Sequence, residues 1–129
     1  MPTLLTQGGL RKQLVQSRLS GTSAASIYTP GTNKTAKVTL IVLCNTTGTA
    51  ATFSIFHDTD GTTYDQTTAL YYAQSLAANT TLLVILDTES AIHMNDSVGN
   101  IAFQQGTSQA ITCTLYGIEE TIGTNRGGS

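Results

Sequence analysis

The residue types best suited to chemistry in this chain lie in one short acidic stretch, HDTDGTTYD, at residues 57–65. Its Asp58, Asp60 and Asp65 are spaced like carboxylates in calcium-binding loops, where a tight turn presents oxygens to a hard cation. The stretch departs from the EF-hand pattern, because Gly61 comes too early and no glutamate closes the loop. The same residues also suit a hairpin loop, in which the Asp side chains bond their own backbone and Gly61 takes a positive φ. We therefore expect a hairpin loop and no metal site, with binding of calcium or of a glycan left open.

Other catalytic residue types lack the arrangements that would activate them. His57 and His93 accompany no G-x-S-x-G motif and no cysteine beside a base, and we expect His93 in a loop or at a rim. The carboxylate pairs at 87/89 and 119/120 would need stacking aromatics for sugar hydrolysis, and the chain has no tryptophan. Glycine motifs for phosphates or dinucleotides are also absent from the sequence. We expect a protein that is not an enzyme and has no cofactor.

The two cysteines, Cys44 and Cys113, both lie inside strand-like runs. Two cysteines are too few for a disulfide framework, and their surroundings do not have zinc-ligand spacing. The favoured interpretation is two free thiols that serve as small apolar side chains, with a single bridge between sheets as the alternative.

Composition limits the classes of partner. Of 129 residues, 40% are hydrophobic and only 11% are charged, which is typical of β-proteins that pack against neighbours. Five of the six cations lie in the first 37 residues and all eight acids lie from Asp58 onward, so the start of one copy could attract the body of another. No dense basic patch with interleaved aromatics supports nucleic-acid binding. No apolar run reaches 18 residues and no secretory leader is evident. We therefore expect that the protein is made in the cytoplasm and does not associate with a membrane.

Turn residues and alternating apolar residues predict an all-β fold. Gly, Pro, Asn and Asp recur between short β-rich runs, as in an antiparallel β-sandwich or jelly roll of seven to eight strands. In the 51–58 and 109–117 segments, apolar residues alternate between the two faces. The expected strands are Ser23–Tyr28, Ala36–Cys44, Ala51–His57, Ala69–Gln74, Thr81–Asp87, Val98–Gln104 and Ala110–Glu119.

Two of these strands are apolar on both faces. The run VTLIVLC (38–44) has one polar residue, and in TTLLVILD (80–87) the five residues between the terminal polar ones are all apolar. A sandwich strand needs one dry face only, so the second apolar face indicates a central position or a cover supplied by another subunit.

The first 22 residues are predicted to form an N-terminal arm or a first strand, ahead of a sandwich domain at 23–120 and a flexible tail at 121–129. This segment is apolar and basic, a combination that suits docking on another protein. The expected partner-binding residues are Leu4, Leu5, Leu10, Arg11, Lys12, Leu14 and Arg18.

Residues 25–120 resemble small β-sandwich proteins of the virions of tailed bacteriophages. The similarity is carried by IYTPGTNKTAKVTLIVLCNTTGTAATFSIFHDTDGTTYD, by ALYYAQSLAANTTLLVILDT and by the closing ITCTLYGIEE. Relatives often have Gly-Asp before a strand, where this chain has HMNDS, so Asp96 alone fits that motif.

The resemblance implies a virion protein with a structural, non-enzymatic role. The role we expect is a head decoration or cement protein that packs on the major capsid protein and on its own copies as a homo-oligomer, with a trimer as one candidate. The alternatives are a tail, neck or fibre component, or a carbohydrate-binding module that uses the 58–65 loop with Tyr64, Tyr71 and Tyr72.

Overall fold

The protein is an all-β sandwich of two antiparallel sheets, as predicted. A computed structural model describes residues 11–58, 62–86, 91–95 and 99–121. Within these ranges there are nine strands. They are β1 (Arg11–Arg18), β2 (Ala25–Tyr28), β3 (Lys34–Asn45), β4 (Ala51–Asp58), β5 (Ala69–Leu76), β6 (Thr81–Ile85), β7 (Ile92–Asn95), β8 (Asn100–Gln105) and β9 (Ile111–Thr121). Within the described residues no helix has the length and apolar character needed to cross a membrane.

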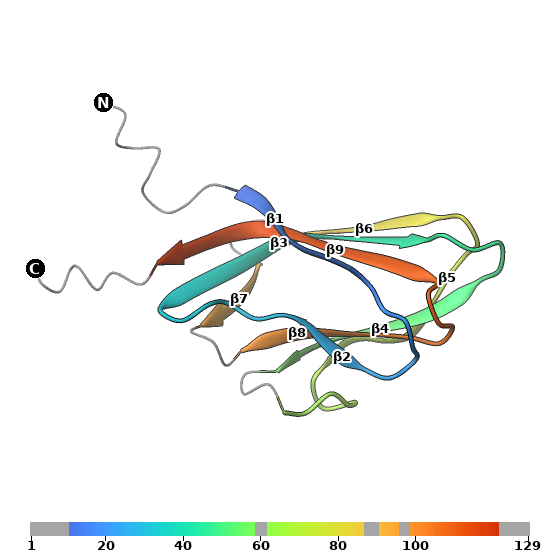
Figure 1. The fold of residues 1–129 in the computed structure, drawn as a ribbon, viewed down its shortest axis with the longest axis horizontal. Helices are drawn as coiled ribbons and strands as arrows, with labels where there is room; N and C mark the ends of the chain where they lie inside the picture. Colours follow the sequence, from blue (N-terminus) through green and yellow to red (C-terminus); the bar gives the residue numbers. More distant parts are fainter. Residues whose placement is uncertain (1–10, 59–61, 87–90, 96–98, 122–129) are drawn as a thin grey trace, which may run out of the picture.

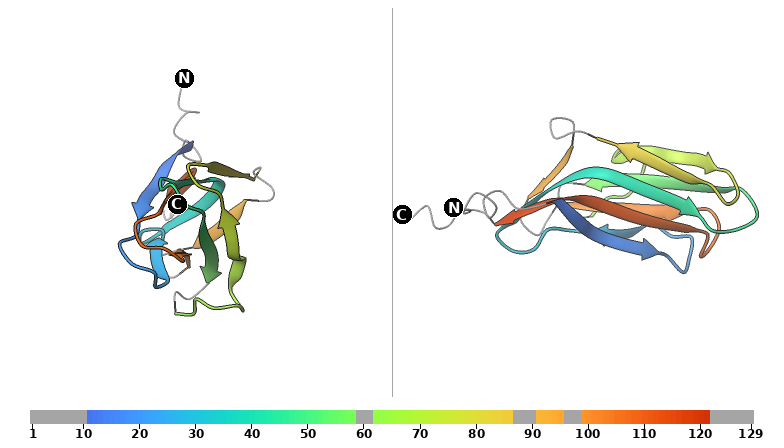
Figure 2. Two further views of the ribbon diagram at one scale, coloured as in Figure 1. Left: turned by 90° about the vertical axis from the view of Figure 1, so that its right-hand side faces the viewer. Right: turned by 90° about the horizontal axis from the view of Figure 1, so that it is seen from above.

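The two sheets face each other as two layers (Figures 1 and 2). The first, sheet A, has the order β1-β9-β3-β6, with β7 paired to the other half of β3. The second, sheet B, has the order β2-β8-β4-β5. In the right-hand view of Figure 2, sheet A faces the viewer, and β1 (blue) and β6 (yellow) lie at its opposite sides, as expected for edge strands.

The pairing of the strands is that of a jelly roll. With β7 set aside, the first strand pairs with the last and so on inward: β1 with β9, β2 with β8, β3 with β6, and β4 with β5. The pairs β3–β9 and β4–β8 then join this long antiparallel ribbon to itself. An antiparallel ribbon rolled in this way gives two four-stranded sheets, the jelly-roll arrangement.

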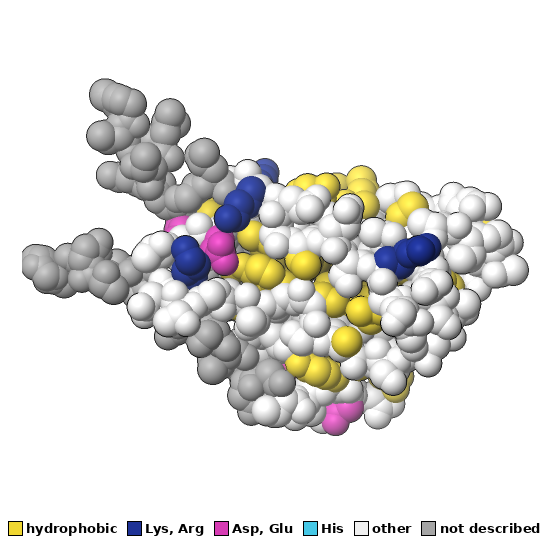
Figure 3. Space-filling model, in the orientation of Figure 1, with side chains coloured by type: hydrophobic (Ala, Val, Ile, Leu, Met, Phe, Trp, Pro, Cys, Tyr) yellow, Lys and Arg dark blue, Asp and Glu magenta, His cyan; other side chains and the backbone are white. Residues whose placement is uncertain are grey.

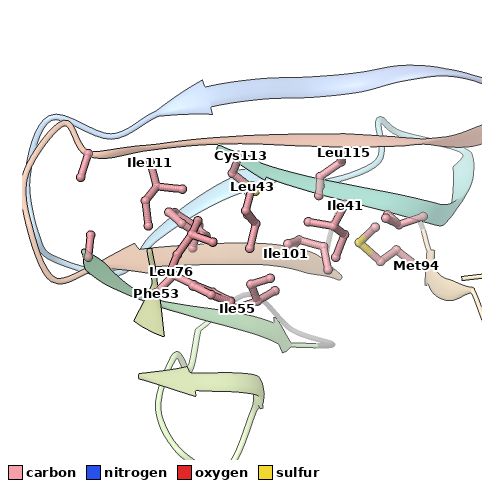
Figure 4. Packing of buried hydrophobic residues seen from close by; sticks show 14 of the residues in the cluster. Ile41, Leu43, Phe53, Ile55, Leu76, Met94, Ile101, Ile111, Cys113 and Leu115 are labelled. Carbon is pink, nitrogen blue, oxygen red and sulfur yellow. The ribbon is translucent and has the colours of Figure 1, made fainter. Parts of the chain in front are cut away.

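The core fills the space between the sheets (Figure 4). Alternation along each strand directs every second side chain inward, so that Ile41 and Leu43 of sheet A lie opposite Phe53 and Ile55 of sheet B. Phe53 also stacks with Phe103 at 6.5 Å between ring centroids.

Buried amides fix the loops at one end of the sandwich. Gln105 is 1% exposed. Its Nε2 donates to the carbonyls of Leu19 and Gly21, and its Oε1 accepts from the N–H groups of Ala110 and Ile111. Every hydrogen-bonding position of this amide is thus used to hold connections between strands, which explains a polar side chain in the core.

The segment at 11–18 forms β1, which pairs with β9 along its length, so a first strand, one of the two alternatives expected for the start of the chain, is present there. One strand differs from the sequence expectation. Residues 92–95 form β7, so His93 lies in a strand and is exposed there, not in a loop. This strand was missed because four residues are too few for an alternating pattern to stand out.

Candidate interaction surface

The outer side of sheet A has an apolar surface that the fold does not cover. The inner side chains of β6, Leu82 and Val84, pack against the core, so the alternating residues Leu83 and Ile85 point outward. Leu83 is 52% exposed and Ile85 is 75% exposed. These two side chains form the most exposed part of the apolar surface on the outer side of sheet A.

Strand register aligns the outward residues in rows across the sheet. One row runs from Ile85 through Leu40 to Tyr116 and ends at Gln13. The next runs from Leu83 through Val42 and Thr114 to Gln16. Each row is apolar at the β6 side and polar at the β1 side, so the apolar surface lies against the β6 edge.

We call the residues Leu40, Val42, Leu83, Ile85 and Tyr116 the outer apolar surface. None of the five is in the core cluster. A groove of about 340 Å³ crosses it, lined by Arg11, Thr39, Leu40, Leu83, Ile85, Leu86 and Tyr116. A groove with one cation at its rim and otherwise uncharged walls suits an apolar protein segment better than a charged ligand.

A polar cluster near the start of β1 joins the two sheets. The Tyr28 hydroxyl donates to Glu119 Oε2 at 2.9 Å, and Lys12 Nζ lies 3.4 Å from Oε1. Burial raises the pKa of the Glu119 carboxyl, but the bonds from Tyr28 and Lys12 and the nearby Lys34 outweigh it and hold this pKa below its usual value. Burial, followed by the bond to Glu119, raises the pKa of Tyr28. The cluster thus links Tyr28 of β2, Lys12 of β1 and Glu119 of β9 through one hydrogen bond and one ion pair.

The predicted partner-binding residues separate into two groups. Leu4, Leu5 and Leu10 lie outside the described residues. Of the remaining four, Lys12 pairs with Glu119 and Arg18 donates to the Gln109 carbonyl, while Arg11 reaches the rim of the groove. Leu14 lies at a bulge in β1 and packs against the protein's own core.

The acidic loop is held by its own backbone in the part that the structure describes. Asp58 is 7% exposed, and its Oδ2 accepts the N–H groups of Thr62 and Thr63 at 2.7 and 2.6 Å. Asp65 accepts the hydroxyl and the N–H of Thr67, and these bonds lower the pKa of Asp65. Asp60 and Gly61 lie outside the described residues. Among the described residues no three His, Cys, Asp or Glu side chains gather as metal ligands would.

The two histidines lie on different sheets. Burial lowers the pKa of His57, and the adjacent Asp58 opposes this shift less strongly. His57 is on sheet B and His93 is on β7 of sheet A. The 87/89 pair lies outside the described residues. Glu119 accepts a hydrogen bond from Tyr28 and pairs with Lys12.

Both cysteines are free thiols, and they occupy opposite faces of sheet A. Leu43 pairs with Cys113 on the inner side, while Cys44 pairs with Thr112 on the outer side. Burial raises the pKa of the Cys113 thiol to about 12. Cys44 is only half-buried and continues the outer apolar surface along β3.

A second, polar depression lies on the outer side of sheet B. It measures about 240 Å³ and is lined by Thr22, Thr52, Phe53, Ser54, Tyr72, Ala73, Gln104, Gln105 and Gly106. Tyr72 is half exposed there, and its ring makes an edge-to-face contact with the ring of Phe56. The other two tyrosines considered for sugar stacking are engaged elsewhere, because Tyr64 bonds Asn100 and Tyr71 packs beside Phe53.

Charge is sparse over the face drawn in Figure 3, where Lys, Arg, Asp and Glu side chains stand in small separate groups among uncharged ones. The Lys12–Glu119 pair is the salt bridge found among the described residues.

No protein-family model matches the chain, and no curated protein matches it. Among solved structures, a chain in the structure of the infectious bursal disease virus Gt strain aligns with a TM-score of 0.40 and 12% sequence identity. The alignment covers 91% of this chain and 32% of that one, so the protein spans about a third of the viral chain's length. A likeness this distant supports no conclusion on function.

The outer apolar surface could be found only in part from the sequence. The runs at 38–44 and 80–87 show apolar residues on both faces, which was the available signal. Tyr116 was missed because the residues before it on the same face of β9, Thr112 and Thr114, are threonines, and only the register with Leu40 brings it into the surface.

Proposed function

We propose that the protein is a structural, non-enzymatic subunit of a virus particle. In its finer form the proposal is a decoration or cement protein of a tailed-bacteriophage head, made in the host cytoplasm and resident in the virion. It would pack on the major capsid protein and on its own copies as a homo-oligomer.

The observation that carries the proposal is the outer apolar surface. Leu83 and Ile85 expose large side chains beside the groove, next to Leu40 and Tyr116. A contiguous apolar surface on a chain so poor in charge is favourable only when another protein covers it. A building block has a use for such a surface, whereas an enzyme would need an activated cluster of polar groups.

The fold and the sequence resemblance support the same role. Jelly rolls recur in viral capsid proteins, in lectins and in cupins, so the fold is compatible with a capsid role and with a carbohydrate-binding role. The resemblance of residues 25–120 to phage virion proteins favours the first of these roles.

The start of the chain is proposed to contact the capsid. Leu4, Leu5 and Leu10 would supply apolar contacts, and Arg11 lies where the described chain begins, at the rim of the groove. A deletion that tests this role must stop at residue 10. Removal of 1–20 would also remove β1, which pairs with β9 and contributes Leu14 and Val15 to the packing against the core.

Gradient-purified particles test the proposal directly. We expect the protein to co-sediment with filled heads in stoichiometric amounts, and gold-labelled antibody to mark the head surface. Label on the neck, tail or fibres would keep a virion role but replace the decoration role. Absence of the protein from every particle fraction, with the protein abundant in the soluble fraction of the same lysate, would refute the proposal. A chain lacking residues 1–10, checked for an unchanged circular dichroism spectrum, should lose binding to heads.

A carbohydrate-binding role is the second candidate, favoured by the polar depression with Tyr72 at its wall. A half-exposed tyrosine beside hydroxyl and amide groups is a common setting for sugar stacking. A glycan array would detect it, with binding lost in Tyr72→Ala and kept in Tyr116→Ala, whose ring lies on the other sheet.

A further inference from the structure

The strands that end the two sheet orders, β1 and β6 in sheet A and β2 and β5 in sheet B, differ in how they are protected against pairing with another chain, and the four-residue β7 continues the β6 edge along β3. Natural proteins block free edges with charge, bulges or very short strands. In sheet A, β1 has Arg11, Lys12 and Arg18 and a register shift between Gln13 and Val15. These features make β1 a poor template for another strand.

The edges of sheet B are blocked as well. β2 has four residues and a register shift. β5 has two shifts against β4, and Ala73 within it has a φ of 50°, which bends the strand. Neither offers a straight run of free backbone groups.

β6 has none of these features. Its residues Thr81–Ile85 are uncharged, include neither proline nor glycine, and pair with β3 in five consecutive positions without a shift. In the described part of the chain no other strand pairs with β6. A straight apolar edge of this kind favours pairing with another strand.

The ladder with β3 shows which backbone groups of β6 point outward. The Asn45 N–H bonds the Thr80 carbonyl, and the Leu86 N–H bonds the Thr39 carbonyl. Hydrogen-bonded and non-hydrogen-bonded pairs alternate in an antiparallel ladder. The N–H and C=O groups of Thr81, Leu83 and Ile85 are therefore directed away from β3, along the open edge.

We propose that the partner of this edge is β6 of a second copy, paired antiparallel about a two-fold axis at Leu83. Leu83 would then exchange both backbone hydrogen bonds with Leu83 of the other copy, and Thr81 would do so with Ile85. The three residues that present free backbone groups thus match their own copies in reverse order, as an isologous interface requires.

The side chains fit the same register. Leu83 and its copy meet on the outer side, each next to Val42 of its own β3. Leu82 meets Val84 of the other copy on the inner side, where both already border the core. The two outer apolar surfaces become one, with the polar ends of their rows, Gln13 and Gln16, at the far rims. The pairing therefore places Leu83 against its own copy and Ile85 beside Thr81 of the other copy, which shields one side of these two exposed side chains from water.

This dimer deepens the proposed structural role and rests on it for its biological meaning, but it is tested on the isolated full-length chain. Failure of the dimer would leave particle association intact, and failure of particle association would leave the dimer intact. We expect sedimentation equilibrium to give twice the chain mass. A monomer at the highest soluble concentration, or a trimer, would overturn the proposal.

Single substitutions separate this edge from the others. Leu83→Lys places a charge on the axis and should halve the mass, while the circular dichroism spectrum stays unchanged, because the side chain is already half exposed in the single chain. Leu70→Lys is the matched control, since Leu70 is 46% exposed on the edge strand β5. A dimer that persists in Leu83→Lys, or is lost in Leu70→Lys, contradicts pairing through β6.

Disulfide trapping tests the register in a Cys44→Ser background. Hydrogen-bonded partners in antiparallel strands lie about 5.5 Å apart at Cα, within the range that a disulfide spans. Leu83→Cys should therefore cross-link with itself under mild oxidation. Thr81→Cys and Ile85→Cys should cross-link only when the two variants are mixed. Efficient self-linking of Ile85→Cys would show a different register and overturn the axis at Leu83. Pairing of the edge with a strand of a capsid protein would give no cross-link in the isolated chain and would also refute the proposal.

Discussion

Tyr28 on one sheet and Glu119 on the other are joined by a hydrogen bond of 2.9 Å from the phenol hydroxyl to the carboxylate. The Glu119 side chain is 18% exposed and also forms a salt bridge with Lys12. Because a carboxylate is a strong acceptor, this bond ties the end of β9 to β2 across the sandwich.

Removing this bond should weaken the fold modestly and change its response to acid. Tyr28→Phe should lower the free energy of unfolding by about 1 kcal/mol at neutral pH, measured in urea. The pKa of Glu119 is lower in the folded protein than in the unfolded chain, so its stabilising contribution is present above the unfolded value of 4.5 and is lost as the pH falls through the folded value.

The wild-type protein should therefore lose more stability than Tyr28→Phe when the pH falls from neutral to a value below the pKa of Glu119 in the folded protein. Tyr116→Phe is the control, because this ring lies on the outer side of sheet A, away from Glu119. Equal acid sensitivity of wild type and Tyr28→Phe would contradict the role given to the bond.

Gly117 should be intolerant of any side chain. A Cβ at this position would lie 1.9 Å from the Lys37 carbonyl oxygen, where β3 and β9 shift register between Val38 and Leu40. Since the obstacle is backbone, relief requires the two central strands to separate, and Gly117→Ala should cost about 2–3 kcal/mol of stability. Thermal unfolding of Gly117→Ala beside Gly48→Ala, where nothing lies within 4 Å of the added carbon, checks this. Equal melting temperatures would show that the bulge adapts.

Gln105 should be far more sensitive to loss of its amide than its neighbour Gln104. Gln105→Leu keeps the size of the side chain but leaves the N–H groups of Ala110 and Ile111 without their acceptor in the core, at a cost of about 3 kcal/mol. Gln104→Leu on the outer side removes a single bond to the Thr22 carbonyl and should be close to neutral. Urea unfolding of the two variants measures the difference, and similar losses would contradict the role assigned to the buried amide.

The fold could be predicted because its local signals agree with one another. The turn residues of the 27–65 stretch separate runs with clear alternation, and β3 and β4 follow from them with ends correct to within two residues. The strand at 92–95 escaped notice because its four residues form a strand only through pairing with Thr35–Val38, a contact distant in sequence.

The position of a strand within a sheet lies beyond local pattern. The run at 80–87 looks as buried as the run at 38–44, yet β3 is central and β6 is an edge. Hydrophobicity shows that both faces of a strand avoid water, but not whether the cover comes from the same chain or from another one. That distinction, which decides where the candidate surface lies, needs the strand order.

The two cysteines provide a last test, of the outer apolar surface itself. Cys113 points into the core with its thiol pKa raised to about 12, whereas Cys44 is half-buried on the outer side. Thiolates react and protonated buried thiols do not, so a maleimide should modify Cys44 and spare Cys113 in the folded protein. Mass spectrometry should find one adduct per chain, two in denaturant, and none in folded Cys44→Ser. If the surface is covered in the virion, modification of Cys44 should be markedly slower in intact particles than in the isolated Leu83→Lys variant. Equal rates in the two would mean that this surface faces solvent in the particle, and the contacts that hold the protein there would then lie elsewhere on the chain.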